Sequence, residues 1–344
     1  MWLYLAALLG LYFLRRWYRE RQTVENLPEK YVLITGCDSG FGNLLARQLD
    51  AQGLRVLAAC LTPQGAEQLR KVTSERLQTV ILDVTRTDSI AAATAWVKEQ
   101  VGDKGLWGLV NNAGVSIPCG PNEWMTKDDF LTVLEVNLIG LVEVTLSFLP
   151  LVRRARGRVV NMASVMGRLA FFGGGYCPSK YGVEAFSDSL RRETRPFGVK
   201  VCMIEPGYFC TRITNPQLLT KHFHCIWQRL PAEIKAAYGE DFFKGSILDI
   251  QKTCNSDLSV VTSCMRHALT ARHPRTRYSA GWDAKLLYLP LSYLPTWFAD
   301  FVLMWSYPPV AQKVEEEEEE KVALEFRQGG SDRRNVTGTW DVSF

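Results

Sequence analysis

The sequence predicts an α/β fold, a Rossmann-like, doubly wound parallel sheet in a single domain. Short apolar runs rich in β-branched residues recur along the chain, and segments of helical periodicity separate them. Continuous apolar runs are typical of strands buried on both faces. Strands that alternate with helices form right-handed βαβ units and therefore a parallel sheet. A glycine-rich turn after the first run favours the same fold.

The pattern places six strands and four helices in order. The expected strands are 31–34, 54–60, 79–82, 106–110, 158–162 and 199–204, and the expected helices are 41–51, 88–101, 127–149 and 177–196. Ligands bind beyond the carboxyl ends of strands in such sheets. The motifs that end these strands are therefore the candidate functional site.

Composition narrows the class of protein. The 344 residues are 47% hydrophobic and 22% charged, as in an ordinary globular chain, and the net charge of +4 does not favour nucleic-acid binding. Nine scattered cysteines, an odd number without a Cys-x-x-Cys pair, predict reduced thiols rather than a disulfide framework. The four histidines show no metal-binding spacing, so no metal site is expected.

The chain divides into four parts: an anchor with a basic flank (1–22), the α/β domain (28–285), an apolar segment (286–311) and an acidic tail expected to be disordered (312–344). Residues 1–14 carry no charge and would form a helix roughly 21 Å long. Four arginines follow at once, Arg15, Arg16, Arg19 and Arg21. This order is the reverse of a cleaved signal peptide. It predicts an uncleaved anchor with a cytosolic domain; an interfacial helix and luminal placement are the alternatives.

Segment 286–311 is apolar and aromatic but is interrupted by Pro290, Pro295 and Asp300. These breaks disfavour a spanning helix. A position in the membrane interface and a buried helical hairpin are the two interpretations.

The turn after the first strand predicts a dinucleotide site. Its candidate cofactor-binding residues are Thr35, Gly36, Asp38, Ser39, Gly40, Phe41 and Gly42. Glycines allow close approach of a pyrophosphate to a helix N-terminus. The second strand ends without Arg or Lys (58–62), and Asp38 would repel a 2′-phosphate, so NAD is favoured over NADP. Asp83 is placed either at the adenine edge or as a cap for 85–89.

Tyr176 and Lys180 are spaced i, i+4 and would share one helix face. An adjacent ammonium favours the tyrosinate, which can take a proton from an alcohol. Ser164 would steady the substrate oxygen, and Asn137 would position Lys180 through a water. The segment Asn111-Asn112-Ala113-Gly114 ends the fourth strand and would line the nicotinamide side of the site; Asn111, Ala113 and Gly114 are the candidate cofactor-binding residues in it.

With these motifs in order, the chain resembles the short-chain dehydrogenase/reductase family over about residues 28–310. It most resembles the membrane-bound retinol and 3α-hydroxysteroid dehydrogenases, as in ITGCDSGFGNLLARQLD and HPRTRYSAGWDAK. The resemblance implies NAD-dependent oxidation of lipophilic alcohols, with Tyr176 as acid/base. It also implies cofactor contacts from Pro206, Gly207 and Thr211. An endoplasmic reticulum membrane location and a homodimer are further expectations, whereas the acidic tail departs from the family.

Two other functions stay open at this point: an NADPH-dependent retinal or ketosteroid reductase, and a non-catalytic protein that binds NAD or lipid. Segment 208–257 is where the family builds its substrate lid, and an apolar pocket suits a lipophilic alcohol. The aromatic and aliphatic residues there either line that pocket or pack as ordinary core: Phe209, Phe223, Ile226, Trp227, Tyr238, Phe242 and Phe243.

Overall fold

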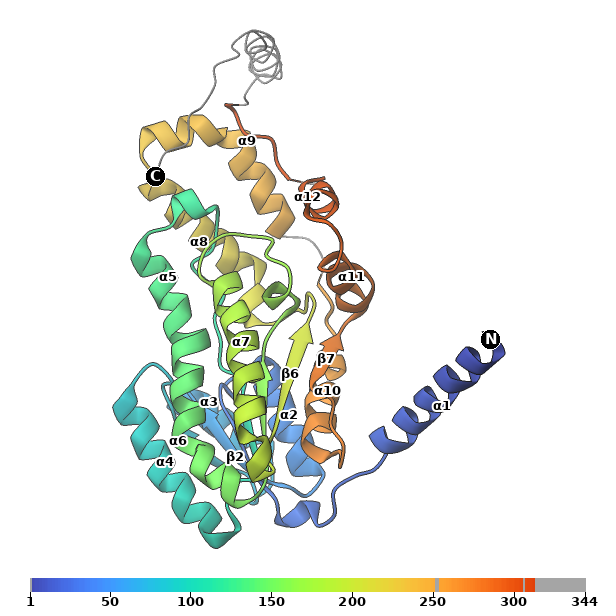
Figure 1. Cartoon of the computed structure of the whole chain (residues 1–344). Helices are drawn as coiled ribbons and strands as arrows, with labels where there is room; N and C mark the ends of the chain where they lie inside the picture. The colour runs from blue at the N-terminus through green and yellow to red at the C-terminus, as the bar shows by residue number, and fades with distance from the viewer. Residues whose placement is uncertain (1, 251–253, 306, 313–344) are drawn as a thin grey trace, which may run out of the picture.

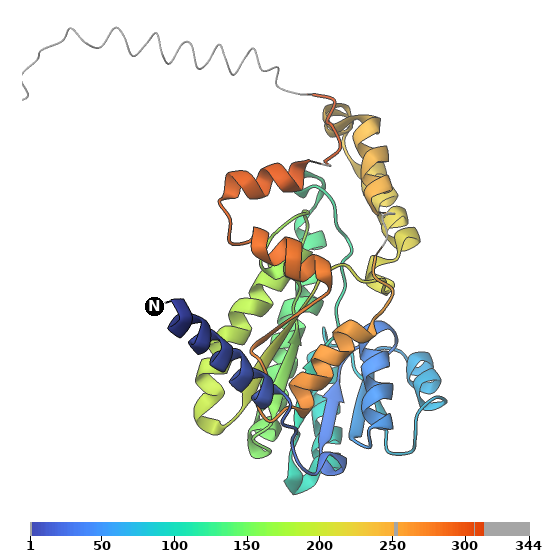
Figure 2. The same ribbon diagram turned by 90° about the vertical axis from the view of Figure 1, so that its right-hand side faces the viewer.

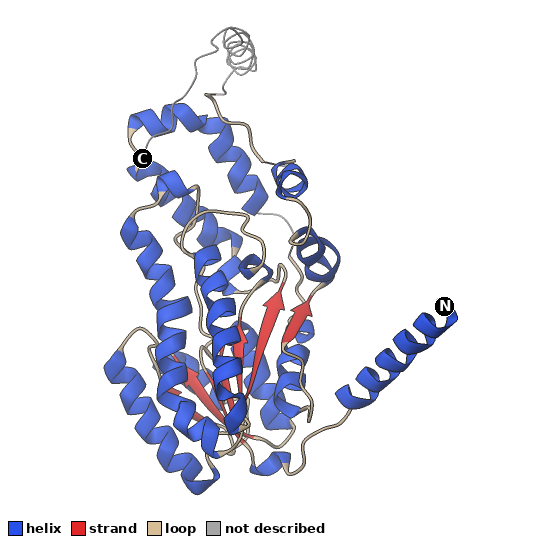
Figure 3. Cartoon of the chain, in the orientation of Figure 1, coloured by secondary structure: helices blue, strands red, loops and turns tan. Residues whose placement is uncertain are grey.

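The computed structural model describes residues 2–250, 254–305 and 307–312. Its centre is a seven-stranded parallel sheet with the order β3-β2-β1-β4-β5-β6-β7 (Figures 1 and 3). The strands are β1 (Tyr31–Ile34), β2 (Arg55–Cys60), β3 (Gln78–Ile81), β4 (Gly108–Asn111), β5 (Arg158–Met162), β6 (Lys200–Pro206) and β7 (Arg277–Ala280). The order reverses between β1 and β4, as in doubly wound folds. The expected fold class is confirmed.

The six expected strands correspond to β1–β6, but β7 was not expected. It is an edge strand that pairs with β6 through Met203 and Arg277. Its sequence, RYSA, holds an arginine, a tyrosine and a serine. Its residues alternate between half-buried and buried, so it lacks the continuous apolar run that identifies strands covered on both faces.

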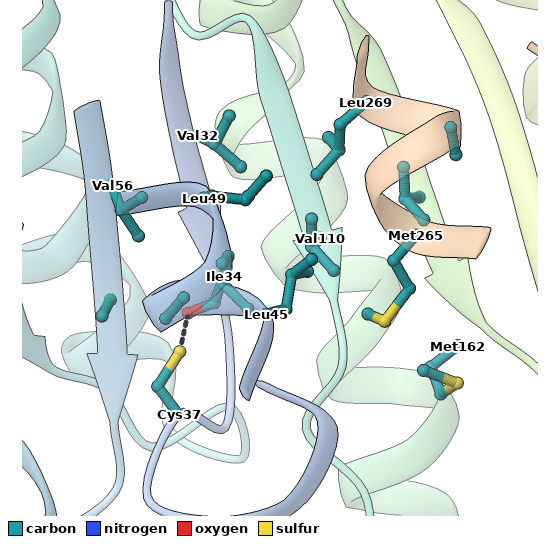
Figure 4. Packing of buried hydrophobic residues seen from close by; sticks show 14 of the residues in the cluster. Val32, Ile34, Cys37, Leu45, Leu49, Val56, Val110, Met162, Met265 and Leu269 are labelled. Carbon is teal, nitrogen blue, oxygen red and sulfur yellow. Dashed lines mark hydrogen bonds between the residues drawn. The ribbon is translucent and has the colours of Figure 1, made fainter. Parts of the chain in front are cut away.

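Helices cover both faces of the sheet. One face carries α2 (Gly40–Ala51), α3 (Pro63–Arg70) and α10 (Ser259–Thr270), and the other carries α4 (Thr87–Val101), α6 (Gly140–Arg154) and α7 (Tyr176–Thr194). On the first face, Leu45 and Leu49 of α2 and Met265 of α10 pack against Val32 and Val110 (Figure 4). These side chains fix the turn between β1 and α2 to the sheet.

The helix expected over 127–149 is longer and contains a π-helical turn in its middle. It comprises α5 (Lys127–Leu134), a π-helical turn at Glu135–Ile139 and α6. By length and hydropathy, Lys127–Arg154 is the one helix among the described residues that could cross a membrane. Val144 and Phe148 of this helix are fully buried against the sheet, so it belongs to the α/β domain.

Beyond the carboxyl ends of β6 and β7 lie α8 (Pro216–Arg229), α9 (Ala232–Ile250), α11 (Leu289–Leu291) and α12 (Thr296–Met304) (Figure 1). The N-terminal helix α1 (Trp2–Glu20) projects from the body on the same side as α11 and α12 in both views (Figures 1 and 2). Its carboxyl end is fixed, because Glu20 pairs with Arg275 and its carbonyl oxygen contacts His267 at 2.8 Å.

The prediction that the cysteines are all reduced is wrong for one pair. Cys210 and Cys254 form a disulfide. The Cys210 amide donates to the Asn255 carbonyl at 2.9 Å, and the Asn255 amide donates to the Tyr208 carbonyl at 3.0 Å. This backbone pairing brings together two cysteines that are 44 positions apart in sequence, which spacing alone does not reveal. The acidic tail expected to be disordered lies, from residue 313 onward, outside the described residues.

Candidate active site

The glycine-rich turn joins β1 to α2. Gly36 and Gly40 adopt φ of 69° and 62°, a region that favours glycine. A Cβ on Gly36 would lie 2.9 Å from the Ala113 backbone, and one on Gly42 would lie 2.5 Å from the Asn112 side chain. The glycines therefore allow the turn to press against the loop that follows β4. Ser39 is exposed at the start of α2, and its hydroxyl does not cap that helix.

Thr35 ties the same two loops together. Its hydroxyl accepts from the amides of Asn112 and Ala113, both at 3.0 Å. The Asn112 side chain donates to the carbonyl oxygens of Thr35 at 2.9 Å and Gly36 at 3.1 Å. Asn112 belongs to the Asn-Asn-Ala-Gly segment expected beside the nicotinamide, but its role as a link between the two loops was not predicted. The predicted Asn111 instead turns into the core, where its side chain donates to Thr145 and Asn161 at 2.8 Å.

The two predicted carboxylates have local partners. Asp38 accepts from the Leu61 amide at 2.7 Å, the Thr62 amide at 3.0 Å and the Thr62 hydroxyl at 2.7 Å. The carboxylate is thus fixed at the end of β2. Asp83 accepts from the amide and hydroxyl of Thr85 at 3.0 and 2.7 Å. The side-chain hydrogen bonds of Asp83 are therefore those of a turn cap, one of the two roles expected for it.

Tyr176 and Lys180 lie in the first turns of α7, and Ser164 follows β5 at the neighbouring strand end. The Ser164 hydroxyl lies close enough to the Tyr176 phenol to lower its pKa by hydrogen bonding, and it accepts from the Met166 amide at 3.1 Å. The Lys180 ammonium is buried, lies 5.6 Å from the centre of the Tyr176 ring and donates to the Met162 carbonyl at 2.8 Å. The structure therefore brings these three side chains together at the carboxyl edge of the sheet.

The expected lowering of the Tyr176 pKa is wrong for this structure. Burial raises the pKa of the phenol to about 12, and the Ser164 hydrogen bond offsets only part of this effect. Burial also lowers the pKa of Lys180, to about 8. Desolvation penalises the charged form of both groups and is the largest cause of both shifts.

Asn137 sits in the π-helical turn, which directs its side chain toward neighbouring loops. Its amide nitrogen donates to the Val115 carbonyl at 2.8 Å and to the Ser179 hydroxyl at 3.1 Å, and its oxygen accepts from the Val115 amide at 2.8 Å. A Cβ on Gly114 would lie 3.2 Å from the Asn137 oxygen and 3.9 Å from the Lys180 ammonium. Asn137 thus links the loop after β4 to the helix that carries Lys180.

The Pro206-Gly207 loop closes the opposite side of the site. The Gly207 amide donates to Ala280 at 2.9 Å, and the Tyr208 amide donates to the Asp283 carboxylate at 2.6 Å. Farther along, Thr211 lies 3.9 Å from a Cβ built on Gly40. The Phe41 and Phe209 rings meet edge to face at 5.8 Å. The loop after β6 therefore packs on the glycine-rich turn.

The aromatic residues of 208–257 are mainly core. Trp124 packs at their centre, and Phe223, Ile226, Phe242 and Phe243 are buried around it. The core-packing alternative therefore holds for these four residues, and Phe209 is buried in the main core. Nearer the phenol, Phe172 stacks on Tyr176 at 5.7 Å. Val165, Met166 and Ala284 are buried in the same small cluster.

A dinucleotide fits this arrangement. The glycine-rich turn precedes a helix N-terminus, and each of its glycines is a place where a side chain would meet the neighbouring loop or the chain would be strained. The buried Lys180 and the Tyr176–Ser164 pair lie beside the loop after β4. Fold and site together define a dinucleotide-dependent oxidoreductase.

Comparison with known proteins supports this class of protein. The profile of the family "short chain dehydrogenase" matches residues 30–221, so the chain belongs to the short-chain dehydrogenases, which are NAD(P)-dependent oxidoreductases. Retinol dehydrogenase 16 of Homo sapiens is 66% identical over 91% of this chain and 99% of that protein. Human 17-beta-hydroxysteroid dehydrogenase type 6 is 62% identical over 91% of this chain and 100% of that protein.

Two solved structures share the fold. A short-chain dehydrogenase from Streptomyces avermitilis is 26% identical, with a TM-score of 0.62, over 88% of this chain and 99% of that chain. A short-chain dehydrogenase from Burkholderia cenocepacia, solved with NADP, is 19% identical, with a TM-score of 0.59, over 80% of this chain and 97% of that chain. At that identity the second likeness concerns the fold alone.

Proposed function

We propose that this protein is a membrane-bound dehydrogenase that uses NAD to oxidise lipophilic alcohols, retinol to retinal and 3α-hydroxysteroids to ketosteroids. The observation that carries the proposal is the position of the Ser164 hydroxyl beside the Tyr176 phenol, next to the buried Lys180. The names of the similar proteins, retinol dehydrogenases and a 17-beta-hydroxysteroid dehydrogenase, support the substrate class.

The chemistry follows from the three side chains. The nicotinamide supplies the hydride acceptor. The Ser164 hydroxyl would hold the substrate oxygen, and the Tyr176 phenolate would accept the alcohol proton as the carbonyl forms. Because burial raises the Tyr176 pKa to about 12, the phenolate needs nearby positive charge, and Lys180 supplies it from the next helical turn. Asn137 holds the backbone around Lys180 through Ser179 and Val115.

The glycine-rich turn, the loop after β4 and the Pro206–Thr211 loop would hold the cofactor. Two observations support NAD over NADP. Residues 58–62 contain no cation, and Asp38 keeps a carboxylate at the end of β2. A 2′-phosphate would meet negative charge where NADP sites supply an arginine.

Two exposed apolar surfaces support membrane binding. The large apolar side chains of α1 are exposed, including Leu8, Phe13 and Trp17. Those of α12 and its flanks are also exposed, including Trp297 and Trp305. This exposure favours the membrane-interface interpretation of 286–311 over a buried hairpin.

The side of the membrane can be argued both ways. The arginines after the anchor favour a cytosolic domain, as positive flanks do. The Cys210–Cys254 disulfide favours the lumen of the endoplasmic reticulum, because disulfides persist in oxidising compartments. Added protease degrades the domain in sealed microsomes in the first case and leaves it intact in the second.

A substrate screen tests the function. The protein in bilayers is mixed with NAD and a panel of retinols and hydroxysteroids, and NADH release is followed. Tyr176→Phe should lose at least about 100-fold in kcat, as expected for a missing acid/base, yet still bind NAD. Tyr181→Phe, on the exposed side of the same helix, is the control. Retained turnover in Tyr176→Phe, or higher kcat/KM with NADPH and carbonyls, would contradict the proposal.

A further inference from the structure

The loop that carries Ser164 is pressed onto the helix that carries Tyr176 and Lys180. A Cβ on Gly167 would lie 2.7 Å from the Lys180 carbonyl oxygen and 3.1 Å from Cγ of Glu184. The loop therefore rests on α7 between these two residues, with backbone against backbone. Any displacement of the loop would change the distance between the Ser164 and Tyr176 hydroxyls.

Arg168 ends this loop and reaches two other elements. One guanidinium nitrogen donates to Glu205 at 3.3 Å, on β6 immediately before Pro206-Gly207. The other donates to the Tyr293 hydroxyl at 2.5 Å, in the apolar C-terminal segment. Glu205 is almost completely buried, with 1% of its side chain exposed, whereas 22% of the Arg168 side chain is exposed, so the carboxylate side of this ion pair is shielded from solvent.

A second arginine also contacts the Glu205 carboxylate. Arg277 on β7 lies 3.4 Å from the same carboxylate and donates to Glu184 of α7 at 2.8 and 3.0 Å. The cluster thus joins the Ser164 loop, α7, β6 and β7. A buried arginine–carboxylate pair gives little net stability but fixes geometry well.

The C-terminal segment also reaches the wall of the site. Its Tyr288 packs, as Tyr176 does, against the buried cluster formed by Ala284 and by Val165 and Met166 of the Ser164 loop. The same segment therefore exposes Trp297 and Trp305 at one end and packs against the wall of the site at the other.

We propose that Arg168 is a positioning residue for the reaction, and that Tyr293 of the C-terminal segment holds it in place. Arg168 sets the distance between the Ser164 and Tyr176 hydroxyls by tying the loop to Glu205. Tyr293 fixes the guanidinium from the other side, so the seating of the C-terminal segment controls the catalytic geometry. The inference rests on the proposed function, because it assigns these residues to the same hydroxyl pair.

The test is a double-mutant cycle in kcat. Arg168→Met should lower kcat about tenfold or more, since small misplacements of reacting groups are costly. Arg168→Lys keeps the positive charge but loses the planar guanidinium that donates to two partners at once. Its kcat should lie between those of Arg168→Met and wild type. Tyr293→Phe should lower kcat less, and the double variant should be no slower than Arg168→Met, because Tyr293 acts through Arg168.

Two further measurements distinguish a positioning role of Arg168 from a purely structural one. The KM for NAD should stay near the wild-type value, while the deuterium isotope effect on the alcohol C–H bond should rise in Arg168→Met. Arg70→Met, an exposed arginine of α3, and Tyr181→Phe are controls. If Arg168→Met folds poorly, Arg168→Lys and Tyr293→Phe carry the test.

Two results would overturn the inference: wild-type kcat in Arg168→Lys and Tyr293→Phe, or effects of Arg168→Met and Tyr293→Phe that simply multiply. Failure of the proposed function looks different, because the wild-type protein itself would then oxidise none of the alcohols.

Discussion

The ammonium of Lys180 donates a hydrogen bond to the carbonyl oxygen of Met162 at 2.8 Å. This bond joins the helix of the Tyr-x-x-x-Lys motif to the end of β5, two residues before Ser164. The amine is therefore buried against a neutral acceptor, and burial lowers its pKa to about 8. The sequence motif predicted the pairing of Tyr176 with Lys180, but it did not predict that burial would disfavour the charged form of Lys180.

The lowered pKa makes stability depend on pH. Lys180 titrates at about 8 when folded and near its ordinary 10.5 when unfolded, so the unfolded chain binds more protons between these values. The free energy of unfolding of wild type, relative to Lys180→Met, should be lowest below pH 8 and rise toward pH 10.5. At about 1.4 kcal/mol per pKa unit, the rise is on the order of 3 kcal/mol. Denaturant unfolding of both proteins at pH 7–10.5 measures it, and a difference independent of pH would contradict the assignment.

Cofactor preference should be adjustable at the end of β2. Leu61 is exposed beside the fixed Asp38 carboxylate. Leu61→Arg places a cation there without removing a bond of Asp38, so kcat/KM with NADP should rise by about tenfold, the value of roughly 1.4 kcal/mol. Val72→Arg adds the same charge at an exposed position after α3 and serves as the control. An equal NADP gain in both variants would show a general charge effect instead.

The Cys210–Cys254 disulfide should stabilise the segment that carries α8 and α9. Chain-entropy arguments for a loop of 44 residues give roughly 4 kcal/mol, and typical measured values are about 2–4 kcal/mol. The double variant Cys210→Ser, Cys254→Ser should therefore have a lower Tm and faster proteolysis between α8 and α9. Cys225→Ser removes an exposed free thiol of α8 and should change neither. Nine titratable thiols in the protein denatured without reductant, rather than seven, would argue against the bond.

Membrane binding should require both apolar surfaces. Removing residues 1–15 keeps the Glu20–Arg275 pair and should weaken, but not abolish, sedimentation with liposomes. Adding Trp297→Ser, Phe301→Ser and Trp305→Ser should abolish it, because these exposed rings supply the remaining apolar contact. Leu131→Ser, at an exposed position on α5, is the control for the serine substitutions. Full binding after truncation and triple substitution would show that another surface is used.

The sequence alone determined the sheet from β1 to β6, the glycine-rich turn and the Tyr176–Lys180 pair. These features depend on local pattern: apolar runs, glycines at fixed spacing and side chains one helical turn apart. The pattern missed β7 and did not predict the π-helical turn around Asn137. A short strand of mixed polarity and a π-helical turn each have weak local signals, because neighbouring elements stabilise them.

Only the tertiary structure decided which partners each group has. Asp83 caps its own turn, Asn111 faces the core, and Cys210 meets Cys254. Packing also reversed the expected shift of the Tyr176 pKa, since burial depends on atoms from several distant segments. Spacing along the chain fixes which residue types can meet on one element. Desolvation and long-range pairing are set when separate elements pack together, and no local pattern records them.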